Sequence, residues 1–179
     1  MVGQTAITVS GGPSFTTPVF HDINALLPAN MNSQATGVND SGEVVGFFQL
    51  ASGNFSAFSD VGGTITPFEF PGSASTQALG VNNLGEIVGD YVDAGGVMHG
   101  FLDNAGAFTM LDPTGSTATT INGINDLGAV VGFYVNAAGN TIGTFGTPVT
   151  TTTPEPGSLL LLATGLFGIG MAYRRRKAA

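Results

Sequence analysis

The segment GVNDSGEVVG at residues 37–46 recurs as GVNNLGEIVG at residues 80–89 and as GINDLGAVVG at residues 123–132. Each copy begins 43 residues after the one before it. An Asn-[Asp/Asn]-x-Gly tetrad stands before an apolar run in every copy, which is typical of a turn leading into a β-strand. The turn residues are Asn39, Gly42, Asn82, Gly85, Asn125 and Gly128. A period of this length predicts tandem β-units rather than one irregular domain.

Each unit is expected to contain about four short strands. In the second unit they are predicted at residues 77–81, 86–92, 98–103 and 108–111, where β-branched and aromatic residues lie between Asn, Asp and Gly. Four strands in a unit of this length are typical of a propeller blade or a related β-repeat. No segment before residue 157 has a convincing helical period; the nearest, residues 22–27, is cut short by Pro28. The predicted fold class is therefore all-β, followed by one C-terminal transmembrane helix.

The units set the domain boundaries. Repeat phases near 1–36, 37–79, 80–122 and 123–147 make a β-repeat domain of about 3.4 units over residues 1–147. A closed propeller usually needs at least four blades, so the array is predicted to be incomplete. Val2-Gly3 falls in register with Val45-Gly46, and residues 1–35 show no basic or apolar leader region. We expect a fragment that lacks upstream repeats and a signal peptide; a genuine short form is the alternative.

The charge distribution excludes several classes of protein. The chain has 12 acidic and 4 basic residues, and the basic ones are Arg174, Arg175, Arg176 and Lys177. Without a basic face there is no surface for nucleic-acid phosphates, so nucleic acid is excluded as a partner. The absence of Cys and the presence of only two His residues exclude thiolate and His-rich metal sites. No cofactor is expected.

The repeated turns and carboxylates are the candidate sites. A calcium loop would need more oxygen ligands than Asn39 and Asp40 supply before Gly42, so the favoured interpretation is a structural turn in which Gly takes a positive φ. Glu43 and Glu86, Asp60 and Asp103, and Glu69 and Asp112 recur once per unit and are expected to form a solvated row. Asp90 and Asp93 occur only in the second unit and are the candidate acid pair of a glycoside hydrolase. His99 is expected to make a structural hydrogen bond. We predict no catalytic site and no enzymatic activity.

The C-terminal region has three parts. A Thr/Pro linker at residues 148–156 ends in Pro154-Glu155-Pro156, and an uncharged apolar run follows at residues 157–173. That run is close to the shortest helix that crosses a bilayer, and it is predicted to do so; a buried core helix is the alternative. The basic tail at residues 174–179 is then expected to stay in the cytoplasm, because positive residues favour that side.

These parts, in this order, resemble the PEP-CTERM sorting signal of Gram-negative bacteria. The resemblance implies export, recognition by an exosortase-type membrane protease, and cleavage near Pro154-Glu155-Pro156. Proteins with this signal are associated with extracellular polysaccharide and biofilm.

The repeat itself, with His99-Gly100-Phe101 after the second turn, resembles the HAF-type extracellular repeat over about residues 2–146. The first unit has Ser56-Ala57-Phe58 at this place and the third has Ile142-Gly143-Thr144, so the marking His and Phe are kept only in part. This resemblance implies an extracellular location but no activity or ligand. We predict a sorted cell-surface or matrix protein with a structural or interaction role, whose partners are the exosortase, the membrane and extracellular polysaccharide. A carbohydrate- or calcium-binding module is the alternative, and an extracellular hydrolase is less favoured.

Overall fold

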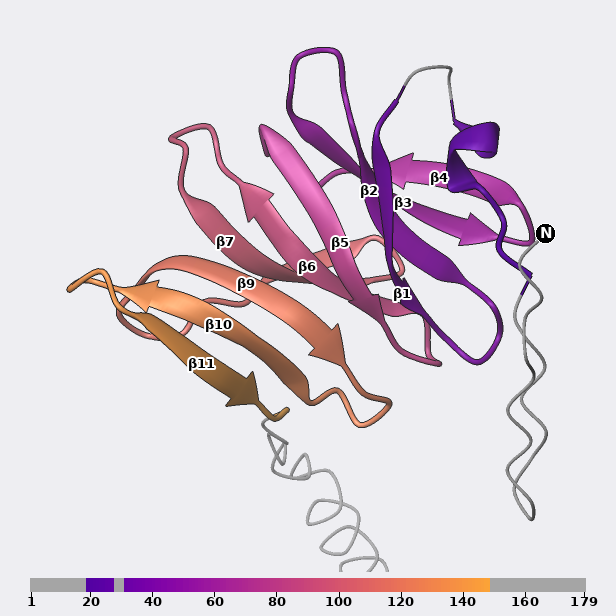
Figure 1. Cartoon of the computed structure of the whole chain (residues 1–179). Coiled ribbons are helices and arrows are strands. Elements are labelled where there is room, and N and C mark those ends of the chain that lie inside the picture. Colours follow the sequence, from indigo (N-terminus) through magenta and orange to yellow (C-terminus); the bar gives the residue numbers. More distant parts are fainter. Residues whose placement is uncertain (1–18, 28–30, 149–179) are drawn as a thin grey trace, which may run out of the picture. The chain divides into compact units, whose positions relative to one another are not determined.

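Short apolar segments bounded by Asn, Asp and Gly form β-strands in the computed structural model, which describes residues 19–27 and 31–148 (Figure 1). The strands are β1 (Ser33–Val38), β2 (Val44–Gln49), β3 (Phe55–Val61), β4 (Thr64–Phe68), β5 (Ser75–Val81), β6 (Glu86–Val92), β7 (Met98–Asn104), β8 (Ala107–Met110), β9 (Ser116–Ile124), β10 (Val130–Asn136) and β11 (Thr141–Gly146). In these residues the helical structure is one 3₁₀ turn, η1 (Ile23–Leu26), capped where Asp22 Oδ1 accepts from the N–H of Asn24 at 2.9 Å. The predicted all-β class is confirmed.

The strands form three antiparallel sheets, each an up-and-down meander. Sheet A has the order β1-β2-β3-β4, sheet B the order β5-β6-β7-β8, and sheet C the order β9-β10-β11 within the described residues. Figure 1 shows the sheets following one another along the chain. The sequence period sets a unit boundary between residues 79 and 80, which falls inside β5. Because β5 pairs with β6, the whole of this strand belongs to sheet B. Sheet and sequence period therefore have the same length but different starting points.

The last glycine of each repeated motif is required by close contact within its own sheet. A Cβ at Gly46, Gly89 or Gly132 would lie 2.0, 1.9 or 2.1 Å from the carbonyl oxygen of Gln34, Gln77 or Thr120, respectively. Real Cβ atoms do not approach backbone oxygen so closely, and the first strand of each sheet carries an irregularity in its register near this point. Only glycine fits the second strand against that irregular first strand.

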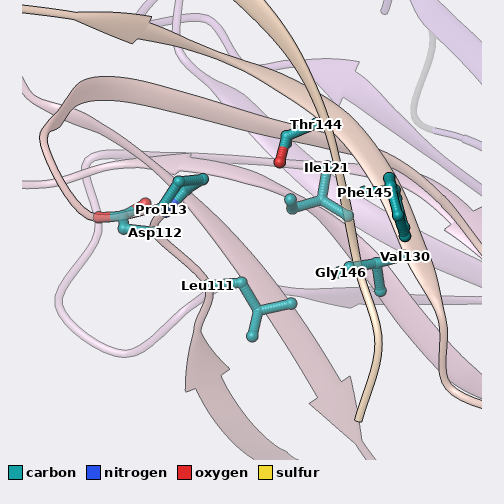
Figure 2. Close-up of a pocket in the computed structure, with 8 residues that line it drawn as sticks. All are labelled: Leu111, Asp112, Pro113, Ile121, Val130, Thr144, Phe145 and Gly146. Carbon is teal, nitrogen blue, oxygen red and sulfur yellow. The ribbon is translucent and has the colours of Figure 1, made fainter.

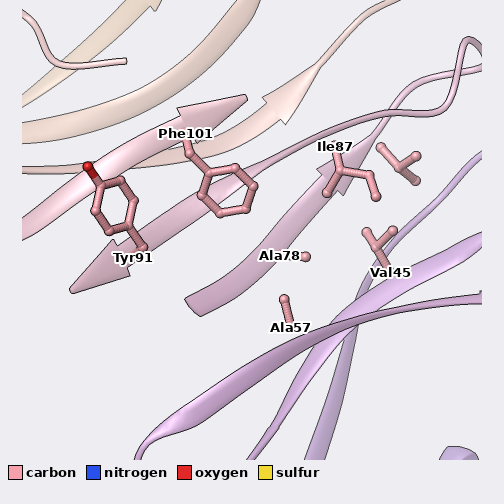
Figure 3. Close-up of a cluster of buried hydrophobic side chains, with 7 residues drawn as sticks. Val45, Ala57, Ala78, Ile87, Tyr91 and Phe101 are labelled. Atoms are coloured by element: carbon pink, nitrogen blue, oxygen red, sulfur yellow. The ribbon is translucent and has the colours of Figure 1, made fainter. Parts of the chain in front are cut away.

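The main core lies between sheets A and B. It contains Val45 and Ala57 from sheet A and Ala78, Val81, Ile87, Tyr91 and Phe101 from sheet B (Figure 3). Phe68, Phe70 and Phe108 pack against this cluster. Successive side chains of a strand point to opposite faces of the sheet. One face can therefore pack against one neighbouring sheet, and the opposite face against the next.

The chain divides after Thr147, and the described strands lie in the unit Met1–Thr147. Across residues 19–27 and 31–148 we find no helix with the length and apolar character needed to cross a membrane. The predicted transmembrane helix at residues 157–173, the linker from residue 149 onward and the basic tail lie outside the described residues, as do residues 1–18.

Candidate functional site

The Asn-[Asp/Asn]-x-Gly turns are closed by the side chain of their own asparagine. Asn82 Oδ1 accepts from the N–H groups of Leu84 and Glu86 at 3.0 and 2.9 Å. Asn125 Oδ1 accepts in the same way from two N–H groups of its own turn at 3.0 and 2.9 Å, and Asn39 Oδ1 accepts from the Glu43 N–H at 3.0 Å and from the Ser41 hydroxyl at 2.7 Å. Gly42, Gly85 and Gly128 have φ angles of 81°, 76° and 73°. Asn and Gly thus have separate tasks: the amide oxygen holds the turn and glycine provides the left-handed backbone.

The same asparagines also bind one sheet to the next. Asn39 Nδ2 donates to the carbonyl oxygen of Asn82 at 3.0 Å, and Asn82 Nδ2 donates to that of Asn125 at 3.1 Å, each across 43 residues. Between these bonds, Asn83 Nδ2 donates at 2.9 Å to a carboxylate oxygen of both Asp40 and Asp126. We call this set of bonds the turn ladder. Its amide and carboxylate groups are engaged within the protein, which makes it a joint between sheets.

Sequence reasoning found these turns but missed the ladder. The available signal was the period itself, because an Asn that recurs every 43 residues is placed to bond its own counterpart in the next unit. Within the described residues, no group of three or more His, Asp or Glu side chains is arranged to hold a metal ion.

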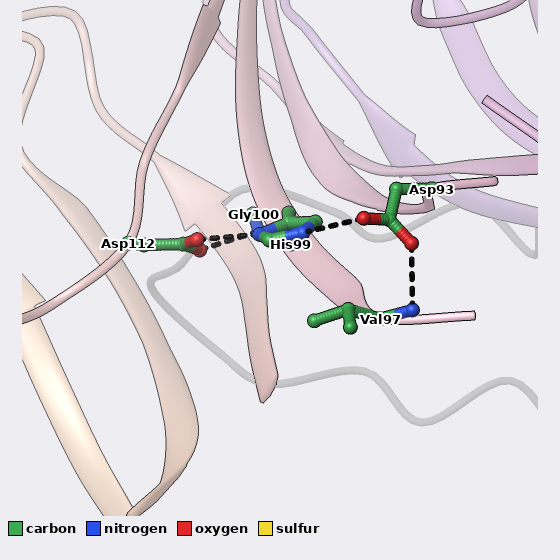
Figure 4. Close-up of polar contacts among 5 residues, drawn as sticks. All are labelled: Asp93, Val97, His99, Gly100 and Asp112. Atoms are coloured by element: carbon green, nitrogen blue, oxygen red, sulfur yellow. Dashed lines mark hydrogen bonds and ion pairs between the residues drawn. The ribbon is translucent and has the colours of Figure 1, made fainter. Parts of the chain in front are cut away.

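A second polar cluster surrounds His99 on β7 (Figure 4). Its Nδ1 lies 2.6 Å from Asp112 Oδ2, and its Nε2 lies 3.5 Å from Asp93 Oδ2. The hydrogen bond to Asp112 raises the pKa of His99 above its ordinary value. Backbone N–H donation from Val97 lowers the pKa of Asp93. Both ring nitrogens face carboxylates, so the imidazole of His99 links Asp93 in the β6–β7 turn to Asp112 in the segment after β8. It is not arranged as a general base that is open to a substrate.

Asp90 lies on β6, where sheet B is covered by sheet C. The residue is 5% exposed, and desolvation raises the pKa of its carboxyl to about 6, although hydrogen bonding with Thr120 acts in the opposite direction. Asp93 lies beyond the end of the strand, in the turn. The structure therefore places the two candidate acids in different surroundings, one buried between sheets and one in an exposed turn. The repeat register could have predicted the burial of Asp90, because Phe47 and Phe133 occupy the same repeat position in the other units.

The expected solvated row of carboxylates is wrong for two of its members. Asp60 and Asp103 are each 8% exposed, so neither lies in a solvated row. Asp103 Oδ1 accepts from the N–H of Gly106 at 2.7 Å and so closes the β7–β8 hairpin. Glu43 and Glu86 are half-buried beside the turn ladder, where each accepts from the amide of its own turn asparagine.

A cavity of about 280 Å³ lies between sheet C and the segment that follows β8 (Figure 2). Its lining includes Leu111, Pro113 and Thr144. The positions one period earlier hold Phe68, Phe70 and Phe101, which fill the equivalent space beside the main core. The cavity thus arises where three aromatic side chains are replaced by smaller ones, and it is slightly below the usual size of a ligand pocket.

Comparison with known families adds one finding. A family model described as the PEP-CTERM protein-sorting motif matches residues 152–177. The chain carries a PEP-CTERM sorting motif. No curated protein matches the chain. The match contains Pro154, Glu155, Pro156 and the basic cluster Arg174–Lys177, all of which lie outside the described residues. The PEP-CTERM motif indicates an exported protein that is sorted to the cell envelope and processed by an exosortase, which is a membrane protein.

Proposed function

We propose that this PEP-CTERM protein has a structural or interaction role at the cell surface or in the extracellular matrix, in association with exopolysaccharide. The observation that carries the proposal is the sorting motif at residues 152–177. The ladder of turns is consistent with it, because the recurring polar residues join sheets to one another. The fold that we propose for the whole protein is an array of propeller-blade-like units of the HAF type.

The proposed route to the surface passes through the membrane. Residues 157–173 would hold the chain in the inner membrane with Arg174–Lys177 in the cytoplasm, until exosortase cleaves near Pro154-Glu155-Pro156. The intact mass of the protein from the native host's envelope and medium tests this route. We expect a released form that ends near residue 155. A protein found only in membranes and still carrying Arg174–Lys177 would contradict it.

We further propose that the protein is not an enzyme. Two observations support this: Asp90 is 5% exposed, and both ring nitrogens of His99 face carboxylates. The test is hydrolysis of a panel of bacterial exopolysaccharides by the processed protein, with binding to the same glycans measured in parallel. We expect binding without turnover. Turnover that disappears in both Asp90→Asn and Asp93→Asn would overturn the proposal.

A further inference from the structure

The outer face of sheet C differs from the equivalent faces of sheets A and B. Val45 and Val88 are 0% exposed, whereas Val131, at the same position of the repeated motif, is 55% exposed. Phe133 is 39% exposed, although Phe47 and Asp90 at its position are 6% and 5% exposed. Phe145, which pairs with Val131 across β10 and β11, is 76% exposed. We call Val131, Phe133 and Phe145 the sheet C patch.

The covered faces show what such a surface receives. A Cβ on Gly37 would lie 3.1 Å from Gly80 Cα, and a Cβ on Gly80 would lie 3.0 Å from Gly123 Cα. The first strand of each following sheet therefore packs directly on the sheet before it. A Cβ on Gly123 would meet only Val131 of its own sheet, at 3.4 Å. The equivalent faces of sheets A and B are each covered by the following sheet. The sheet C patch is the third surface of this kind.

We propose that the sheet C patch pairs with the same patch of a second copy of this chain, giving a closed two-fold dimer. Two observations favour contact between identical faces over head-to-tail stacking. At the opposite end of the array the aromatic side chains of sheet A are not available for such a contact, since Phe58 and Phe48 are 0% and 5% exposed. Head-to-tail stacking would also bring Asp126 against Asp40 of the next copy, without the Asn83 that bridges these two carboxylates here.

Charge permits the contact between like faces. The chain has a formal net charge of -8, but β9, β10 and β11 contain no charged residue. Two sheet faces can pack about 10 Å apart with interdigitating side chains, so Val131, Phe133 and Phe145 from both copies would form one apolar layer. Contact through a single self-complementary patch closes after two copies.

The test is the oligomeric state of the full chain in a mild detergent, measured by light scattering on a sizing column. We expect twice the chain mass, and we expect Val131→Ser/Phe145→Ser to weaken the dimer by about tenfold or more, because exposed patch residues become central in the interface. Both residues are exposed, so the double variant is expected to fold. The matched control is Val61→Ser, which removes a similarly exposed valine from sheet A, at 62% exposure.

The absence of Cys allows a second measurement. We expect a thiol crosslinker to link Val131→Cys chains covalently in pairs, as read on a denaturing gel, and to leave Val61→Cys chains unlinked although they still associate. Asp126→Asn separates the two geometries, because it would restore the bridging amide in a head-to-tail contact; we expect it to leave the assembly at two copies. A monomeric unsubstituted chain, a dimer that persists in the double patch variant, or a growing series of oligomers in Asp126→Asn would each overturn the proposal.

Discussion

The interface between sheets A and B and the outer face of sheet C use the same repeat positions with different outcomes. Val45 is buried by the neighbouring sheet, whereas Val131 stands in the same motif and remains more than half exposed. Strand formation and turn closure follow from the residues of each unit. Burial depends on whether another sheet lies on that face. A repeated motif therefore specifies the strands and turns of a unit and the residues that can contact the next unit. The stabilising free energy of that contact is gained only where two units pack together.

The largest test of this contrast compares Phe101 with Thr144, which stands one period later beside the cavity. Phe101 is fully buried, so Phe101→Ala is expected to lower the free energy of unfolding by about 3–5 kcal/mol. Thr144→Ala removes fewer atoms next to existing empty space and should cost less than about 1 kcal/mol. Denaturant unfolding of the two variants checks the difference. Equal losses would mean that the two interfaces are packed equally well.

Asp90 provides the second test, because it occupies a covered position that holds Phe in the other units. Its pKa rises from 3.8 to about 6 on folding. The folded state therefore holds the proton more tightly, and stability is lost as pH rises from about 4 to about 6. At pH 7 the loss is about 2–3 kcal/mol. Asp90→Asn should raise stability at pH 7 by a similar amount and flatten the profile between pH 4 and pH 6.

Asp93→Asn is the matched control for the pH profile, and its sign is opposite. Donation from the Val97 N–H lowers the pKa of Asp93, so the ionised form stabilises the fold above its unfolded pKa, and this contribution is lost on acidification. We expect Asp93→Asn to lower stability at neutral pH. Thermal unfolding across pH 3.5–8 measures both variants. A stabilising Asp93→Asn, or an unchanged profile in Asp90→Asn, would contradict the assignment of buried and exposed acids.

The third test uses two glycines at one repeat position. Gly80→Ala would place a Cβ 3.0 Å from both Asn122 O and Gly123 Cα, so sheets B and C must separate slightly. The expected cost is about 1–3 kcal/mol. Gly123→Ala meets only the Val131 side chain at 3.4 Å and should change stability by less than about 0.5 kcal/mol. If Gly123→Ala were as damaging as Gly80→Ala, a sheet would already cover the outer face of sheet C within one chain.

Sequence reasoning could predict the strands, because each is a local event. Residues 86–92 were predicted as a strand and form β6 with the same bounds, and the other predicted strands of that unit agree within two residues. It could not predict which residues face a neighbouring sheet. The solvated row failed at Asp60 and Asp103 for this reason: hydrophilic character does not reveal that Asp103 closes a hairpin through the N–H of Gly106, or that Asp60 is buried. The repeat register carries the information that hydropathy lacks, since it places Asp90 at a Phe position and Thr144 at the position of Phe101.

The smallest expected effect isolates one bond of the turn ladder. Asn82 and Asn125 each hold their own turn through Oδ1, but only Asn82 also donates from Nδ2 to a carbonyl oxygen of the next sheet among the described residues. Asn82 Nδ2 also donates to Glu86, whereas Ala129 stands at that position beside Asn125, so both asparagine substitutions are made in a Glu86→Ala background. In that background both Asn82→Ala and Asn125→Ala lose the turn bonds, and only Asn82→Ala also loses the bond to the next sheet. We expect Asn82→Ala to be the more destabilising by about 1 kcal/mol, the usual net value of one such hydrogen bond. The two variants are compared by denaturant unfolding at one protein concentration, low enough that the proposed dimer is dissociated. Equal losses would show that the bond from Asn82 to the Asn125 carbonyl adds nothing beyond the two separate turns.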